Sequence, residues 1–181
     1  WTFPIHVSEH KKHAVYVGSQ YVHRSTDFGQ SWEVISPDLT LNLKSHQQSS
    51  GGIAIDNLMT FDGSVLFAIN ESPLKQGLIW VGSNDGQVHL TRNGGRTWIN
   101  VTENINMPPW GTISNIEASR FDAKTAYISV DFHQMGDFEP YIYKTTDYGK
   151  SWKKISGNIP RSYSSFVHVV KEDPKQESVL Y

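Results

Sequence analysis

Three carboxylates lie close together in one polar segment of the sequence. Asp131, Asp137 and Glu139 belong to the stretch 131–140, which also contains two phenylalanines. Two carboxylates facing each other across a cleft act as acid and base in glycoside hydrolysis, and an apolar wall raises the pKa of the one that donates the proton. The alternative is that these are solvated loop acids, or acids that hold a cation together with backbone carbonyls. The residue types leave both interpretations open.

Four other residues are candidates for contact with a ligand. Trp110 follows two prolines, and its ring face suits the apolar side of a pyranose as well as a hinge packed on a neighbouring sheet. His133 lies in the acidic segment, His46 lies in a polar run, and Arg161 lies outside the repeats described next. No histidine pair at the i, i+4 spacing of metal ligands lies in a segment expected to be helical, so the sequence predicts no metal site and no cofactor.

An eight-residue pattern occurs three times, at 25–32, 91–98 and 145–152. Each copy reads Ser/Thr-x-Asp/Asn-x-Gly-x-Ser/Thr-Trp. We expect the Asp or Asn oxygen to accept hydrogen bonds from backbone N–H groups one or two residues on, and the Gly to adopt a positive φ. We expect the Trp to pack between neighbouring sheets. The residues with these predicted structural roles are Ser25, Asp27, Gly29, Trp32, Thr91, Asn93, Gly95, Trp98, Thr145, Asp147, Gly149 and Trp152.

A short apolar segment also recurs, at 14–18, 78–82 and 125–129, and residues 179–181 begin a fourth copy. Its β-branched and aromatic residues without helical spacing are typical of strands. The two repeats together predict an all-β fold with an internal repeat. The resemblance given below implies that this fold is a segment of a β-propeller built from four-stranded antiparallel blades. Helix is expected to be almost absent.

The repeats divide the chain into the blades of one incomplete propeller domain, 1–181. The expected parts are blade one at 1–40, an insertion and blade two at 41–104, blade three at 105–160, and the start of blade four at 161–181, with a strand at 166–171. Three blades and a fraction do not close a ring. We therefore expect the remaining blades of a six- to ten-bladed ring as partners of this segment; self-association is the alternative.

The repeated turns resemble Asp-boxes, also called BNR repeats, which recur in the propellers of sialidases, xyloglucanase-type glycoside hydrolases and sortilin-type receptors. The stretches 71–82 and 140–152 resemble bacterial proteins described as sortilin-like or as glycosyl hydrolases with BNR repeats. The resemblance implies that Asp-boxes connect the third and fourth strands of each blade. It also implies two possible activities, since xyloglucanase-type propellers use a pair of aspartates and sortilin-type propellers bind peptides.

Extra chain length is expected on one rim of the propeller. Fourth-to-first and second-to-third strand connections share a rim, and the repeated turns lie on the other. The long connection within 39–64, the segment 106–111 and the segment 131–140 all belong to the first rim. Long loops on a rigid scaffold commonly carry function. The sequence therefore predicts the ligand site on that rim.

Composition excludes several classes of function. The net charge of −2 predicts no binding of nucleic acid, and no apolar run is long enough to predict membrane insertion. The absence of cysteine excludes disulfides, unlike the animal sortilins, and is compatible with a secreted or periplasmic bacterial protein. Sialidases need three clustered arginines, but Arg24, Arg92 and Arg96 lie in or beside the repeated turns.

These observations favour a binding or scaffold module that presents the loops of one rim to a polysaccharide or to a protein or peptide ligand. The alternative is a glycoside hydrolase that uses carboxylates of the segment 131–140. A second alternative is a sortilin-like peptide receptor.

Overall fold

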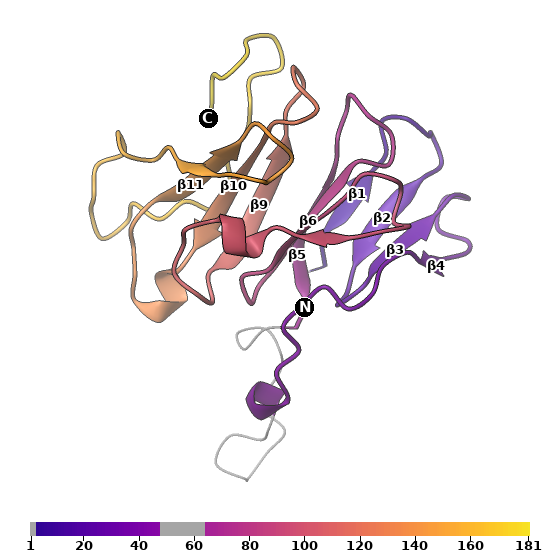
Figure 1. The fold of residues 1–181 in the computed structure, drawn as a ribbon, viewed down its shortest axis with the longest axis horizontal. Helices are drawn as coiled ribbons and strands as arrows, with labels where there is room; N and C mark the ends of the chain where they lie inside the picture. Colours follow the sequence, from indigo (N-terminus) through magenta and orange to yellow (C-terminus); the bar gives the residue numbers. More distant parts are fainter. Residues whose placement is uncertain (1–2, 48–63) are drawn as a thin grey trace.

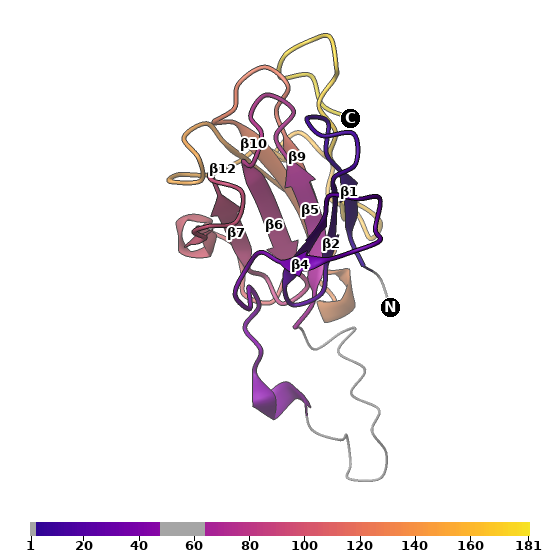
Figure 2. The ribbon, with the colours of Figure 1, turned by 90° about the vertical axis from the view of Figure 1, so that its right-hand side faces the viewer.

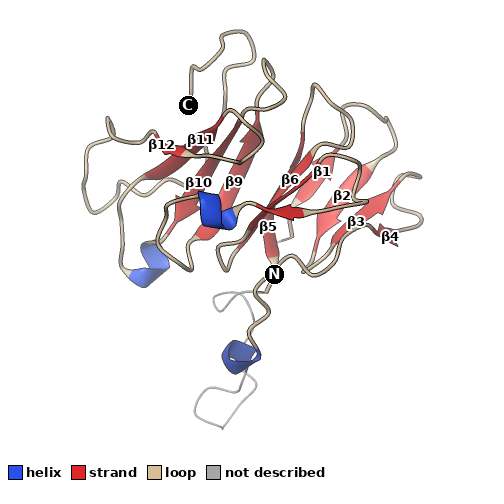
Figure 3. Ribbon diagram, viewed as in Figure 1, coloured by secondary structure: helices blue, strands red, loops and turns tan. Residues whose placement is uncertain are grey.

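The computed structural model describes residues 3–47 and 64–181, and within them the chain is almost entirely strands and turns (Figures 1 and 3). Three antiparallel sheets of four strands each follow one another along the chain. Three short 3-10 helices occur in the described residues: η1 (Lys44–Gln47), η3 (Thr102–Asn104) and η4 (His133–Met135). The prediction of an all-β propeller segment with almost no helix is confirmed.

In each sheet the strand order follows the chain order, so every connection is a hairpin between neighbours. We call the three sheets blades 1 to 3. Blade 1 contains β1 (Ile5–Val7), β2 (Val15–Gly18), β3 (Val22–Ser25) and β4 (Glu33–Val34). Blade 2 contains β5 (Leu66–Glu71), β6 (Ile79–Ser83), β7 (Val88–Thr91) and β8 (Ile99–Asn100). Blade 3 contains β9 (Thr112–Ala118), β10 (Ala126–Asp131), β11 (Tyr141–Thr145) and β12 (Lys153–Lys154).

The blades stand side by side (Figures 1 and 2). Residues on their facing surfaces form buried hydrophobic clusters. Strand β6 of the central blade is buried along its whole length. Because side chains alternate across a strand, Ile79 and Val81 pack in a cluster with residues of blade 1, whereas Trp80 packs in a cluster with residues of blade 3. In contrast, β1, the edge strand of blade 1, leaves Ile5 and Val7 exposed. Burial on both faces therefore depends on chain packed against both sides of the sheet.

Blades approach so closely near β6 that a glycine is required. A Cβ atom placed on Gly82 would lie 2.3 Å from Cγ2 of Ile113 on β9. Blade 2 also approaches blade 1 closely at Gly18. A Cβ atom placed on Gly18 would lie 2.9 Å from the Cβ atom of Leu66 on β5. Strand two of one blade thus packs directly on strand one of the next.

The three repeated turns share one hydrogen-bond network. In the first, the Ser25 hydroxyl accepts from the Gly29 N–H at 2.7 Å, and the Asp27 carboxylate accepts from the Ser31 N–H at 2.9 Å and from its hydroxyl at 2.6 Å. The same bonds recur at 145–152, and at 91–98 an Asn replaces the Asp. The expectation that the acid reaches one or two residues on was wrong, because the turn curls back and brings the fourth residue's N–H to the carboxylate.

Positive φ values in these turns occur at two successive residues. Gly29, Gly95 and Gly149 have φ of 87°, 95° and 78°. Phe28 and Tyr148, which precede two of these glycines, have φ of 61° and 63°. A non-glycine residue in this region is strained, so the surrounding hydrogen bonds must hold it there.

The tryptophans that end the repeated turns have two kinds of surroundings. Trp98 donates from Nε1 to the Ile35 carbonyl of the preceding blade at 2.9 Å. Trp152 meets Trp80 of its preceding blade edge to face, with ring centroids 5.9 Å apart. Trp32 is 45 % exposed, and its Nε1 donates to the Gly29 carbonyl of its own turn. The expected wedge between sheets therefore occurs at two of the three positions.

Buried tyrosine–glutamate pairs join blade 1 to blade 2, and blade 3 to the segment that follows it. Tyr16 of β2 donates to Glu71 at the end of β5 at 3.1 Å, and Tyr127 of β10 donates to Glu172 at 2.8 Å. Glu71 and Glu172 are only 2 % and 4 % exposed. At the equivalent place between blades 2 and 3 the aromatic residue is Trp80, and no glutamate faces it.

The expected strand at 166–171 is not formed. Residues 171–181 instead make a short hairpin that contains one isolated bridge, between Glu172 and Leu180. The Lys171 and Tyr181 backbones exchange two hydrogen bonds, of 3.0 and 2.9 Å.

The turn acid Asp147 is expected to stabilise blade 3. Asp147→Ala removes the acceptor of the Ser151 N–H and hydroxyl, so we expect the free energy of unfolding to fall by about 1–2 kcal/mol, as for a lost helix cap. Urea denaturation measures the change. Lys150→Ala, an exposed substitution in the same turn, is the control, and equal midpoints for the two variants would contradict the assignment.

The Tyr127–Glu172 pair gives a prediction with a pH dependence. Burial, with the hydrogen bond to Glu172, raises the pKa of Tyr127 to about 12. A folded-state pKa above that of the unfolded chain means that the stabilisation is complete below about pH 10 and is lost as pH rises through 12. Tyr127→Phe should therefore cost about 1–2 kcal/mol at pH 7, and the gap to wild type should narrow above pH 10. Tyr163→Phe, on a ring that is 81 % exposed, is the control.

Candidate functional site

Backbone hydrogen bonds sort the loops onto two rims. Each repeated turn bonds to the first hairpin of its own blade: Phe28 to His13, Gly94 to Gly77, and Tyr148 to Lys124. The opposite rim holds the β6–β7 turn, where Asp85 accepts from the Leu41 N–H at 2.8 Å and Asn84 contacts Thr112. Figure 1 shows η1 and η4 at the same lower end of the molecule. The segments 39–47, 106–111 and 131–140 thus lie on one rim.

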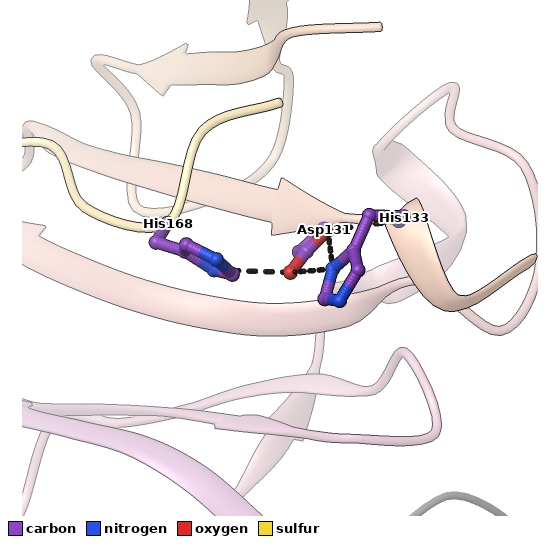
Figure 4. A group of neighbouring side chains, drawn as sticks. All are labelled: Asp131, His133 and His168. Carbon is purple, nitrogen blue, oxygen red and sulfur yellow. Dashed lines mark hydrogen bonds and ion pairs between the residues drawn. The ribbon is translucent and has the colours of Figure 1, made fainter. Parts of the chain in front are cut away.

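Asp131 and two histidines form a compact group on this rim (Figure 4). Asp131 ends strand β10, and its side chain is 6 % exposed. His133 Nδ1 lies 2.6 Å from Asp131 Oδ2 and 2.7 Å from Oδ1, and the His133 backbone N–H donates to Oδ1 at 2.9 Å. His168 Nδ1 lies 3.0 Å from the same Oδ2. Two imidazoles from distant parts of the chain therefore converge on one buried carboxylate.

Aromatic rings surround this group. Phe166 stacks on His133 with centroids 4.8 Å apart and meets His168 edge to face at 5.0 Å. Phe138 packs on Tyr163 at 4.7 Å and lies 6.1 Å from Phe166. We call Phe138, Tyr163 and Phe166 the aromatic cluster.

The other two predicted acids do not join Asp131. Asp137 accepts from the Tyr141 hydroxyl at 2.7 Å and from the Glu139 N–H at 2.9 Å. Burial, together with this hydrogen bond, raises the pKa of Tyr141. Glu139 forms an ion pair with Arg161 at 2.9 Å, and Lys154 lies 3.6 Å away. Each acid thus has its own donors, and Arg161 is brought to the predicted rim by Glu139.

Two candidates for ligand contact lie elsewhere on the rim. Trp110 is half-buried, has φ of 69°, and its backbone runs beside Gly86 in the β6–β7 turn. His46 lies in η1, with its side chain outside the described part of the structure, as is most of the polar run 45–52.

Arginines have separate partners in the described chain. Arg24 pairs with Glu33, Arg120 pairs with Glu9, and Arg92 lies over the ring of Tyr148. These contacts use the guanidinium groups singly and not as a triad on one anion.

Sequence reasoning missed His168, Phe166 and Tyr163. They follow the third repeated turn, where an ordinary blade-four strand was expected. The only signal was the presence of two aromatic residues and one histidine within 163–168. Spacing alone could not place His168, because it lies 35 residues after His133 and meets it through the packing of one segment on the next.

Several solved structures share this architecture. The GH74 xyloglucanase from Xanthomonas campestris aligns over 97 % of this chain and 25 % of its own, with a TM-score of 0.64 and 18 % identity. The GH74 enzyme of Niastella koreensis covers 92 % of this chain and 24 % of its own, with a TM-score of 0.56 and 15 % identity. YCF48 bound to D1 peptide covers 84 % and 39 %, with a TM-score of 0.51 and 17 % identity.

These likenesses define the class of fold as a β-propeller. The chain spans about a quarter of the length of the GH74 structures. At such identities the likeness extends to the fold alone. No protein-family profile and no curated protein matches the sequence. Within the described residues, no helix has the length and apolar character needed to cross a membrane.

The two acids at the ends of the segment 131–140 should differ in their effect on stability. Asp131→Ala leaves the His133 N–H and two imidazoles without their acceptor, so we expect a loss of about 1–3 kcal/mol. Glu139→Ala removes partly exposed ion pairs and should cost less than about 1 kcal/mol. Urea denaturation of both variants at pH 7 tests the difference. A larger loss for Glu139→Ala would show that the buried group is not the one that holds this loop.

Proposed function

We propose that this propeller segment is part of a module that binds a polysaccharide through the aromatic cluster and the charged groups beside it. The observation that carries the proposal is the exposure of Tyr163, whose ring is 81 % exposed and packs against Phe138. An exposed ring held by a second ring offers a flat apolar face with little conformational entropy to lose.

Polar groups flank this face. Glu139 and Arg161 form an ion pair on the same rim, and Asp137 bonds to Tyr141. Binding sites for small ligands combine aromatic surfaces with a few polar groups that fix orientation. A sugar has both an apolar face and hydroxyl groups, so it matches this combination. A protein or peptide ligand is the alternative occupant, since aromatic residues and Arg are also enriched at protein interfaces.

Binding is favoured over hydrolysis because none of the three predicted acids lies against an apolar wall alone. Asp131 is bonded by two histidines, Asp137 by a tyrosine, and Glu139 by an arginine. A glycosidase acid needs surroundings that favour its protonated form.

A glycoside hydrolase stays the second candidate, because GH74 enzymes share the architecture over nearly the whole chain. A peptide-binding role, sortilin-like or otherwise, is the third, since YCF48 in complex with a peptide has a related fold. We place all three functions in a secreted or periplasmic protein, a proposal that follows from the resemblance to bacterial propellers and the absence of cysteine.

Tyr163→Ala tests the binding proposal. We expect affinity for soluble xyloglucan or β-glucan, measured by affinity gel electrophoresis, to fall at least about tenfold, because a stacking face is lost. Tyr181→Ala is the matched control: its ring is 75 % exposed and it lies far along the chain, on the terminal hairpin. Equal retardation of both variants and wild type would contradict the proposal.

A reducing-sugar assay on the same glycans separates the two leading candidates. Turnover that disappears in Asp131→Asn or Asp137→Asn would replace the binding proposal by the hydrolase. Binding without turnover supports the module. Retardation by none of the glycans, combined with capture of peptides, would favour the peptide-binding role.

A further inference from the structure

We propose that Asp131, His133 and His168 form a binding site for a divalent transition metal of the zinc class. In the described residues their ligand atoms, one carboxylate oxygen and two imidazole nitrogens, all lie within 4.8 Å of one another. No binding of a metal follows from the function proposed above, so the two stand independently.

The convergence of the donors is the first argument. Both rings direct Nδ1 at Oδ2 of Asp131, at 2.6 and 3.0 Å (Figure 4). Metal–ligand bonds of about 2.0–2.1 Å in a tetrahedral site place neighbouring donors about 3.3 Å apart. The two carboxylate–imidazole separations differ from this value by less than about 1 Å, and all three donors lie within 4.8 Å of one another. A small rearrangement of the group would therefore admit an ion.

The supports around the donors are the second argument. The His133 backbone N–H fixes the Asp131 carboxylate at 2.9 Å, and Phe166 stacks on the His133 ring. The backbone of His168 is held by the Ser129 hydroxyl, which donates to the His168 carbonyl at 2.9 Å. Metal sites depend on such outer contacts, because they orient the ligands before the ion arrives.

The donor set selects the kind of ion. Two imidazoles and one carboxylate suit Zn²⁺, and also Ni²⁺ and Cu²⁺, whereas Ca²⁺ and Mg²⁺ prefer oxygen ligands. The His168 side chain is 57 % exposed and that of His133 is 33 % exposed. Solvent therefore reaches both imidazoles.

The geometry gives the ion a structural consequence. Asp131 and His133 belong to blade 3, whereas His168 belongs to the segment that follows it. An ion bound by all three would tie these parts together. Binding to the folded chain alone raises its apparent stability by mass action.

Zinc titration of the full chain tests the proposal. After treatment with EDTA and its removal, isothermal titration with ZnCl₂ should show one site, and the melting temperature should rise by at least about 3 °C at saturating zinc. His168→Ala should weaken the affinity at least about tenfold and abolish the shift. His13→Ala, an exposed histidine on the opposite rim, is the matched control and should retain both.

Cobalt provides a readout of the ligand set. Co²⁺ in a site of four or five ligands gives intense visible absorption, which hydrated Co²⁺ lacks, and His133→Ala should remove it even if His168→Ala fails to fold. Circular dichroism in EDTA establishes folding of each variant. Zinc affinity unchanged by both substitutions, loss in His13→Ala to the same degree, or no saturable site in wild type would each overturn the proposal.

Discussion

The structure depends on the need to bury both faces of each four-stranded sheet. Strand β6 shows this constraint directly, because Ile79 and Val81 pack toward blade 1 and Trp80 packs toward blade 3. An isolated sheet of this kind would expose one apolar face or both. Neighbouring blades must therefore approach closely, which explains Gly82 against Ile113 and the buried polar pairs that cross the seams. The rims are free of this constraint, and so they can carry varied loops.

The candidate site lies on the rim, where the segment after blade 3 packs against the end of strand β10. Asp131 is at the end of β10, and Ser129, two residues earlier, holds the backbone of His168. The packing of the segment 161–173 on blade 3 therefore decides which side chains meet. Rigid strands supply Asp131, while a loop and a following segment supply the histidines. The same arrangement brings Phe138 to Tyr163 and Glu139 to Arg161.

Much of the architecture could be predicted from the sequence, because each repeated pattern determines the local structure of a turn or a strand. The pattern that contains Asp27, Gly29 and Trp32 fixes a turn, and strand alternation fixes which side chains face a seam. Which backbone N–H the turn carboxylate accepts from could not be predicted, since this depends on the path of the turn. Nor could His168 be assigned to Asp131, because that contact needs the relative placement of blade 3 and the segment that follows it. The prediction of a strand at 166–171 was wrong for a related reason. Strand formation depends on the neighbouring strands as well as on the local sequence.

Residues that meet across two packed sheets, or across blade 3 and the segment after it, are not independent of each other. Where a tyrosine reaches across, as Tyr16 and Tyr127 do, a buried glutamate receives its hydroxyl. Between blades 2 and 3, strand pairing places Ala118 where Glu71 stands in blade 2, and the aromatic residue is Trp80. A glutamate there would face an indole packed edge to face on Trp152. An unpaired buried carboxylate is costly, so the indole with a small neighbour and the phenol with an acid are two self-consistent solutions. Replacing only one residue of a pair would place an acid beside an indole, or a phenol hydroxyl beside a residue that cannot accept its hydrogen bond. The two residues of each pair are therefore energetically coupled.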